Sequence, residues 1–370
     1  INLNKNYNLE ISMYLSREKE INDKLSINVG VRSSWFADLG PHYQYKIKTP
    51  SGIVDTLIYT DYGKIRNSFI SFEPRITARY LINENSSLKG SISFVQQNLH
   101  LISNSTAGLP YDYWITASKE IKPQTSTQYL IGYFTNLFSK KISLSIEAYY
   151  KTLNNILDFK DNSNLLTEKS IEINTLQGIG RSYGVELFVE KNVGKHVGWI
   201  SYTLARTQYK IENVNNDQWY SPRYDIRHNL SIVWIKKISD RKELSMTFKY
   251  TSGGFISLPT AIGNFDGALF SIYNFKNNYE LPSYNRADLS YKLKTKRYFK
   301  SKLKKEWVFT LYNVYAKENI FSLVYRPVVN KPSDTDGIRN NPEFKIYNYN
   351  ELYKFYLFSI IPTITFNVKF

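Results

Sequence analysis

Hydrophobic and polar residues alternate with a period of two along many segments of this chain. The alternation is clearest over residues 25–31, 142–148, 244–250, 287–293 and 364–370. Successive side chains of a β-strand face opposite sides, so this pattern predicts strands with one apolar and one polar face. A soluble β-sandwich also alternates in this way, and the pattern alone does not decide between a sandwich and a membrane barrel.

The lengths of the breaks between these segments favour the barrel. Short breaks fall near residues 17–23, 83–87, 138–141, 191–195, 238–242 and 297–304. Long breaks alternate with them, near residues 37–67, 98–125, 153–179, 209–225, 253–283 and 327–352. Outer-membrane barrels have short periplasmic turns and long extracellular loops, whereas a sandwich has no reason to place every long loop at one end. We therefore predict an all-β, transmembrane antiparallel β-barrel.

The breaks divide the chain into about 13 strands that form a single domain over residues 1–370. The predicted strands are 7–16, 24–36, 68–82, 88–97, 126–137, 141–152, 180–190, 196–208, 226–237, 243–252, 284–296, 305–326 and 353–370. With the long loops outside, the last strand runs down to a periplasmic C-terminus, and Ile1 lies in an extracellular loop. Single-chain bacterial barrels have an even strand number, and an open edge in hydrocarbon leaves costly unpaired backbone groups. We therefore expect further strands upstream of this chain.

Composition narrows the classes of function. The 370 residues include no Cys, which excludes a disulfide framework, thiolate metal sites and a Cys nucleophile. Mean hydropathy is −0.40, and no run of about 20 apolar residues could form a spanning helix. The net charge of +16 is scattered through turns and loops without an RNA-binding motif. We expect no nucleic-acid partner and instead contacts with outer-membrane lipids and phosphate-rich lipopolysaccharide.

Several segments resemble a known family in their order and spacing. They are Ser87-Leu88-Lys89-Gly90-Ser91, Gln128-Tyr129-Leu130-Ile131-Gly132-Tyr133, Gly180-Arg181-Ser182-Tyr183-Gly184-Val185-Glu186, Gly198-Trp199-Ile200-Ser201-Tyr202 and Tyr224-Asp225-Ile226-Arg227-His228. Along nearly its whole length the chain resembles the C-terminal barrel portion of TonB-dependent outer-membrane receptors. The resemblance implies a 22-stranded barrel, of which the first strand here would be strand 10. It also implies that an N-terminal plug, the segment that contacts the TonB complex and about nine strands lie upstream.

The resemblance predicts a receptor and transporter in the Gram-negative outer membrane, not an enzyme. Its substrate would be a scarce or bulky nutrient, such as an iron chelate, cobalamin, an oligosaccharide or a peptide, taken up with energy from TonB. A surface lipoprotein that covers the barrel mouth is a further expected partner. The alternatives are a passive channel of about 14 strands, a barrel that anchors contacts with a surface protein, and a soluble sandwich lectin.

Aromatic residues of the long loops are the candidate ligand contacts. They are Tyr111, Tyr113 and Trp114 in one loop and Trp219 and Tyr220 in another, with Arg223 nearby to hold an anion. Aromatic faces bind sugars, siderophore rings or peptides. The alternative is an aromatic belt at the membrane interface, and for Trp114 packing within its loop.

Two further groups of residues have candidate roles. Asp225, Arg227 and His228 follow Arg223 at a strand mouth, where alternating charges would form ion pairs in a polar lumen or contact a ligand or the plug. Phe366, Val368 and Phe370 alternate up to the C-terminus and resemble the signal that the barrel-assembly machinery reads. A flat strand with a free edge can pair with such a machine by strand addition.

We expect no cofactor, no metal and no catalytic residue. The four histidines lie far apart in the sequence, without the spacing of a zinc site. Gly178, Gly180 and Gly184 have the wrong spacing for a dinucleotide loop and precede a strand rather than a helix. Glycines at tight or bulged positions of a strand are the better interpretation.

Overall fold

The computed structural model describes residues 7–47, 54–102, 113–160, 175–265, 268–296, 298, 303–329 and 347–369. The chain divides into two compact units, one of residues 1–189 with 203–225 and the other of residues 190–202 with 226–370. A single domain over residues 1–370 stays a prediction.

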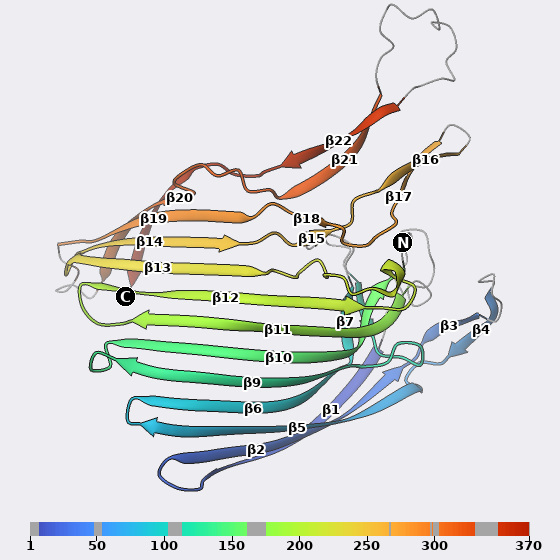
Figure 1. Ribbon diagram of the computed structural model, residues 1–370, viewed down its shortest axis with the longest axis horizontal. Helices are drawn as coiled ribbons and strands as arrows, with labels where there is room; N and C mark the ends of the chain where they lie inside the picture. Colours follow the sequence, from blue (N-terminus) through green and yellow to red (C-terminus); the bar gives the residue numbers. More distant parts are fainter. Residues whose placement is uncertain are drawn as a thin grey trace, which may run out of the picture. The chain divides into compact units, whose positions relative to one another are not determined.

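One antiparallel sheet of thirteen strands contains most of the regular structure (Figure 1). In sheet order, the strands are β1 (Tyr7–Glu20), β2 (Leu25–Leu39), β5 (Ile65–Asn83), β6 (Ser86–Gln97), β9 (Gln124–Leu137), β10 (Ile142–Phe159), β11 (Thr175–Lys191), β12 (His196–Lys210), β13 (His228–Ser239), β14 (Lys242–Thr251), β19 (Tyr284–Lys294), β20 (Lys304–Tyr312) and β23 (Ile361–Lys369). The order of the strands in the sheet is the same as their order along the chain, which is the meander topology of an up-and-down barrel. The all-β fold class and the number of strands agree with the sequence prediction.

The remaining strands form two-stranded hairpins within the long connections. These are β3 (His42–Ile47) with β4 (Val54–Thr60), β7 (Leu99–Ile102) with β8 (Tyr113–Thr116), β15 (Phe255–Ile256) with β18 (Tyr279–Glu280), β16 (Ala261–Phe265) with β17 (Ala268–Ile272), and β21 (Ser322–Val329) with β22 (Tyr347–Phe355). A 3₁₀ turn, η2 (Asn215–Asp217), follows β12. No helix among the described residues is long and apolar enough to cross a membrane.

The predicted strand over residues 305–326 is wrong in its second half. β20 ends at Tyr312, and residues from Ser322 onward belong to a loop hairpin with β22. Asn313 and Ala316 have φ angles of 54° and 55°, which an extended strand cannot accommodate. The Asn313 side-chain amide donates to the Lys317 carbonyl at 2.9 Å and thereby stabilises the turn. Alternation of residue types did not reveal this break.

The two faces of the sheet differ in polarity as the alternation predicts. On β1, Leu9, Ile11, Met13 and Leu15 lie on one face with exposed fractions from 44% to 75%. Ile131 of β9 occupies the same type of position and is 61% exposed. An apolar face that stays exposed in an isolated chain is the face that would contact lipid in an outer-membrane barrel.

Hydrogen-bonded polar side chains cover the opposite face. Across β1, β2 and β5 the register aligns Ser12 with Ser34 and Ser34 with Ser71. The hydroxyl groups of Ser12 and Ser34 share a hydrogen bond of 2.8 Å, and Arg32 donates to Ser12 at 2.9 Å. Ser71 donates to the buried carboxylate of Glu73 at 2.9 Å. Pairing of this kind removes the cost of burying polar groups.

Candidate functional site

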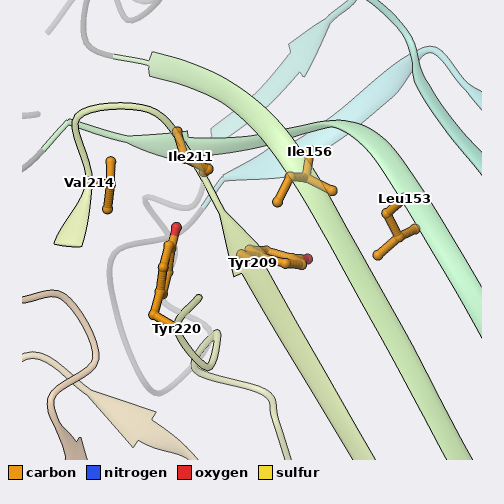
Figure 2. Close-up of a cluster of buried hydrophobic side chains, with 6 residues drawn as sticks. All are labelled: Leu153, Ile156, Tyr209, Ile211, Val214 and Tyr220. Carbon is orange, nitrogen blue, oxygen red and sulfur yellow. The ribbon is translucent and has the colours of Figure 1, made fainter. Parts of the chain in front are cut away.

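A cluster of buried side chains lies in the first unit, where β10 and β12 end and the long connection after β12 begins. We call it the loop-end cluster, and Figure 2 shows its six side chains. They are Leu153, Ile156, Tyr209, Ile211, Val214 and Tyr220. The amide of Tyr209 donates to the Tyr220 carbonyl at 2.8 Å, and the amide of Tyr220 donates back at 2.9 Å. This pair of bonds holds the connection against the end of β12.

The turn between Ile211 and Tyr220 depends on residues that tolerate left-handed backbone. Asn213, Asn215, Asn216 and Asp217 have φ angles between 50° and 63°. Asn and Asp adopt this conformation more readily than other non-glycine residues because their short polar side chains bond locally. The amide of Asn213 donates to Asp217 Oδ1 at 2.7 Å. The Asn-rich sequence is therefore the local reason that the connection reverses and buries Val214.

Glycines of β11 allow the end of β12 to approach closely. A Cβ atom at Gly178 would lie 2.4 Å from the Lys210 carbonyl oxygen and 2.6 Å from Ile211 Cγ1. A Cβ at Gly180 would lie 3.0 Å from the Tyr209 ring. These contacts support the structural interpretation of the glycines over a dinucleotide loop.

Phenol groups and a carboxylate form the polar edge of the loop-end cluster. The Tyr220 hydroxyl donates to Asp158 Oδ2 at 2.8 Å, and the hydroxyls of Tyr209 and Tyr224 share a hydrogen bond. The rings of Tyr209 and Tyr220 meet edge to face, with centroids 6.3 Å apart. Although 56% of the Tyr224 residue is exposed, burial of its hydroxyl raises the pKa of Tyr224 above the usual value of 10.0. The Tyr224 hydroxyl therefore stays protonated and can donate hydrogen bonds.

An arginine and a tryptophan stack beside these phenols. The guanidinium carbon of Arg181 lies 4.4 Å from the centroid of the Trp219 ring. Arg181 also donates two hydrogen bonds to Gln208 Oε1, at 3.0 and 2.8 Å. Both interactions orient the guanidinium, and a cation–π contact of this type is worth about 0.5–1 kcal/mol at an exposed site. Arg181 was not among the ligand contacts that the sequence predicted, since its place in the alternation does not reveal a partner 38 positions along the chain.

The β7–β8 hairpin forms a second loop structure. Trp114 of β8 lies opposite Leu101 of β7 and is 60% exposed. His100, on the adjacent position of β7, is 4% exposed, and its Nε2 atom has no hydrogen-bond partner among the described residues. Burial lowers the pKa of His100 to about 4, so the imidazole is neutral at physiological pH. Trp114 is thus exposed, whereas His100 lies on the buried face of the hairpin, opposite Ile115.

The other predicted loop contacts separate into different environments. Tyr220 is buried in the loop-end cluster, Trp219 is half-buried under Arg181, and Arg223 is half-buried close to Tyr224. Tyr111 lies outside the described residues, and of Tyr113 the structure describes only the backbone, in β8. Trp219, Tyr220 and Arg223 thus share one loop.

Asp225, Arg227 and His228 form no ion pair within the described part of the chain. Asp225 is 1% exposed and accepts the Thr207 amide at 2.7 Å, so it fastens the connection to β12. The Arg227 amide donates to Ser252 at 2.8 Å. His228 bonds the Tyr202 hydroxyl at 2.9 Å and shares the face of Leu230 and Trp234, which is apolar. The lumen role that the sequence predicts for these three residues stays a prediction.

The predicted assembly signal lies on β23. Phe366 and Val368 are 45% and 39% exposed on the apolar face, and the Phe366 ring lies 4.5 Å from that of Trp307. Phe370 lies outside the described residues. The role of these residues in assembly stays a prediction.

The polar face of the first unit contains a hollow of about 340 Å³ that the sequence did not single out. It is lined by Gln128, Leu130, Glu147, Tyr149, Lys151, Ser182 and Glu186. Glu147 and Glu186 carry no ion pair among the described residues. The sequence could have indicated Glu147 and Glu186 only through their polar positions in alternating strands. In the part of the chain that the structure describes, no group of three or more acidic, His or Cys residues could hold a metal.

Comparisons with known proteins agree with this architecture. Structures of similar fold include the ferric-catecholate import receptor Fiu from Escherichia coli K12, with a TM-score of 0.55, 15% identity and coverage of 85% of this chain and 41% of that one. The siderophore receptor PiuA from Acinetobacter baumannii has a TM-score of 0.56, 13% identity and coverage of 85% and 40%. The FrpB iron transporter from Neisseria meningitidis has a TM-score of 0.54, 12% identity and coverage of 85% and 42%.

The chain spans about two fifths of the length of these receptors. A comparison with curated protein sequences found no match. Residues 3–316, most of the chain, match the family described as TonB dependent receptor-like, beta-barrel. The chain belongs to the TonB-dependent receptor family, of which it forms part of the β-barrel.

Proposed function

We propose that this protein is an outer-membrane receptor that binds a scarce nutrient at its long-loop end and imports it with energy supplied through TonB. The observation that carries the proposal is the stack of Arg181 on Trp219 beside the buried loop-end cluster. The protonated hydroxyl of Tyr224 lies at the polar edge of that cluster. This arrangement suits an anionic ligand with aromatic or planar groups.

An iron chelate is the first substrate class to test. Siderophore complexes combine negative charge with planar metal-binding groups, which matches an arginine beside aromatic rings. The similar solved structures are a ferric-catecholate import receptor, an iron transporter and a siderophore receptor, and their identities of 12–15% relate them to this chain by fold alone. Cobalamin, an oligosaccharide or a peptide remain alternatives.

We narrow the set of proposed ligand contacts by their exposure. Trp114 offers an exposed ring, Trp219 offers a half-buried ring beneath Arg181, and Arg181 and Arg223 offer positive charge. Tyr220 acts as a support, because its side chain is buried and its hydroxyl is committed to Asp158. Tyr111 and Tyr113 keep the role that the sequence predicts for them.

The orientation and the partners follow from the same proposal. The long connections with their hairpins face outward, and the short turns with the C-terminus face the periplasm. The hollow with Glu147 and Glu186 then lies on the lumen face, where it would accept basic groups of a plug. We further propose contacts with the TonB complex through an upstream segment, with the barrel-assembly machinery through β23, with lipopolysaccharide, and with a surface lipoprotein.

The ligand site can be tested by binding of ferric chelates to outer membranes that contain the full-length gene product. Trp219→Ala removes the ring under Arg181, and we expect about tenfold weaker binding, since the exposed cation–π contact is worth about 0.5–1 kcal/mol and stacking of the ring on a planar ligand group about as much again. Tyr129→Ala, on the apolar face of β9, is the control and should leave affinity unchanged. Equal affinities for the two variants would exclude the surface around Trp219 and Arg181 as the site.

A further inference from the structure

The short-turn end of the second unit is strongly basic. Within residues 190–196, 236–243, 292–296, 303–306 and 366–369, which we call the basic rim, twelve residues are basic and four are acidic. The basic residues are Lys191, Lys195, Lys236, Lys237, Arg241, Lys242, Lys292, Lys294, Lys296, Lys304, Lys305 and Lys369. The acidic residues are Glu190, Asp240, Glu243 and Glu306. The corresponding turns of the first unit, 17–24, 79–89 and 137–143, contain seven basic and four acidic residues.

Backbone hydrogen bonds join the turns of the basic rim into one surface. The amide of Lys237 donates to the Lys195 carbonyl at 2.8 Å, which links the β11–β12 turn to β13. The amide of Lys294 donates to the Arg241 carbonyl at 2.9 Å, which links the β13–β14 turn to β19. The charges therefore gather in space as well as in sequence.

The acidic side chains of the rim do not neutralise it. In the β20–β23 ladder Lys304 lies directly opposite Lys369, an arrangement of like charges that destabilises a sheet. Glu243 is shared between Lys292 and Lys294, at 3.5 and 3.6 Å. An external anion would relieve this repulsion.

Five lysines of the rim are exposed and available to such an anion. They are Lys191, Lys195, Lys236, Lys237 and Lys242, and none forms an ion pair with any described residue. Each ammonium group can donate up to three hydrogen bonds. Phosphate oxygens are strong acceptors for these donors.

Aromatic and aliphatic side chains accompany the lysines. The rings of His196 and Trp234 stack with centroids 5.7 Å apart, and Trp234 Nε1 donates to His196 Nδ1 at 3.3 Å. Val193 and Ile238 are 53% and 50% exposed, and Trp307 is 40% exposed. Tryptophan and exposed aliphatic groups beside lysine ammoniums are typical of the membrane–water interface.

We propose that the basic rim binds the phosphate headgroups of anionic phospholipids in the leaflet on the short-turn side of the membrane. Trp234, Val193 and Ile238 rest against the acyl boundary, while the lysines donate to phosphates. Continuity of the rim with the apolar strand faces favours lipid over a soluble acidic partner. This inference takes only the membrane location from the proposed function. It does not depend on which nutrient is transported.

The test titrates the delipidated full-length protein in detergent with phosphatidylglycerol and counts bound lipids by native mass spectrometry. In one variant, Lys236→Gln, Lys237→Gln and Lys242→Gln are combined. Each lysine near an anionic surface strengthens binding about fivefold, so the variant should bind about a hundredfold more weakly. Binding to the unaltered protein should also fall steeply between about 0.05 and 0.5 M salt.

The matched control neutralises Lys19, Lys140 and Lys141, three exposed lysines of the first unit's short turns. The control should bind phosphatidylglycerol within about threefold of the unaltered protein, and phosphatidylcholine should bind weakly to both. Equal losses in variant and control, equal binding of phosphatidylcholine, or equal binding of soluble glycerol phosphate would each overturn the proposal. Binding of ferric chelates, measured on the same preparations, reports the proposed function separately, so that either proposal can fail alone.

Discussion

Gly178→Ala probes the close contact between β11 and the end of β12. The new Cβ would lie 2.4 Å from the Lys210 carbonyl oxygen and 2.6 Å from Ile211 Cγ1, and it would clash with backbone that cannot rotate away. Ile211 is fully buried in the loop-end cluster, so the strand end must move and carry Ile211 out of its packing.

The expected cost follows from that clash. Inserting a methyl group into a well-packed site costs about 1–3 kcal/mol. The amides of Tyr209 and Tyr220, which bond each other's carbonyls, report opening of the loop-end cluster by hydrogen exchange. A loss of about 2 kcal/mol would make both amides exchange about 30-fold faster in the full-length protein.

Gly90→Ala is the matched control. Gly90 lies in β6, and the nearest atom to its added Cβ, the Leu130 carbonyl oxygen, is 3.8 Å away. Exchange at Tyr209 and Tyr220 should then stay within about threefold of the unaltered protein. If Gly178→Ala and Gly90→Ala behave alike, the close approach does not hold the loop-end cluster, and the reasoning about the glycines fails.

Three further predictions test the faces and the loops. Ile131→Arg places a charge on the apolar face and should cost about 2–4 kcal/mol in lipid bilayers, whereas Leu130→Arg on the polar face should cost far less; urea unfolding in vesicles measures both. The pKa of His100 is near 6.5 in the unfolded chain and about 4 in the folded one, so acid protonates the unfolded imidazole first. The β7–β8 hairpin should therefore lose about 2 kcal/mol of stability between pH 6.5 and 5. Local hydrogen exchange would accelerate over this range, and a flat pH profile would contradict the prediction. Tyr220→Phe removes the hydrogen bond to the Asp158 carboxylate and should cost about 1.5 kcal/mol in thermal unfolding, with no loss if that carboxylate finds water instead.

Alternation of residue types was sufficient to predict most of the main sheet. Over residues 142–148 and 244–250 each apolar residue shares a face with its second neighbour, and both segments lie in strands of the sheet. The pattern could not locate the end of β20, because Asn313 interrupts the strand through its backbone angle and not through its polarity. The pattern could not assign His228 to one face of its strand either, since a shift of one position exchanges the two faces.

The candidate site was less accessible to sequence reasoning. Trp219 and Tyr220 stand out as adjacent aromatics, but whether a ring is buried or accessible depends on segments distant in the chain. Tyr220 meets Asp158, which lies 62 positions earlier, and Trp219 meets Arg181. Contacts between residues so far apart in the chain depend on strand order and register. The sequence pattern did not predict the register of individual residues.

Import of a labelled ferric chelate into whole cells tests the function most directly. Cells that carry the full-length gene should accumulate the chelate, and accumulation should cease when TonB is deleted or the proton gradient is collapsed. Accumulation that continues without TonB, or stable ion conductance by the purified full-length protein, would identify a passive channel and contradict the proposed receptor.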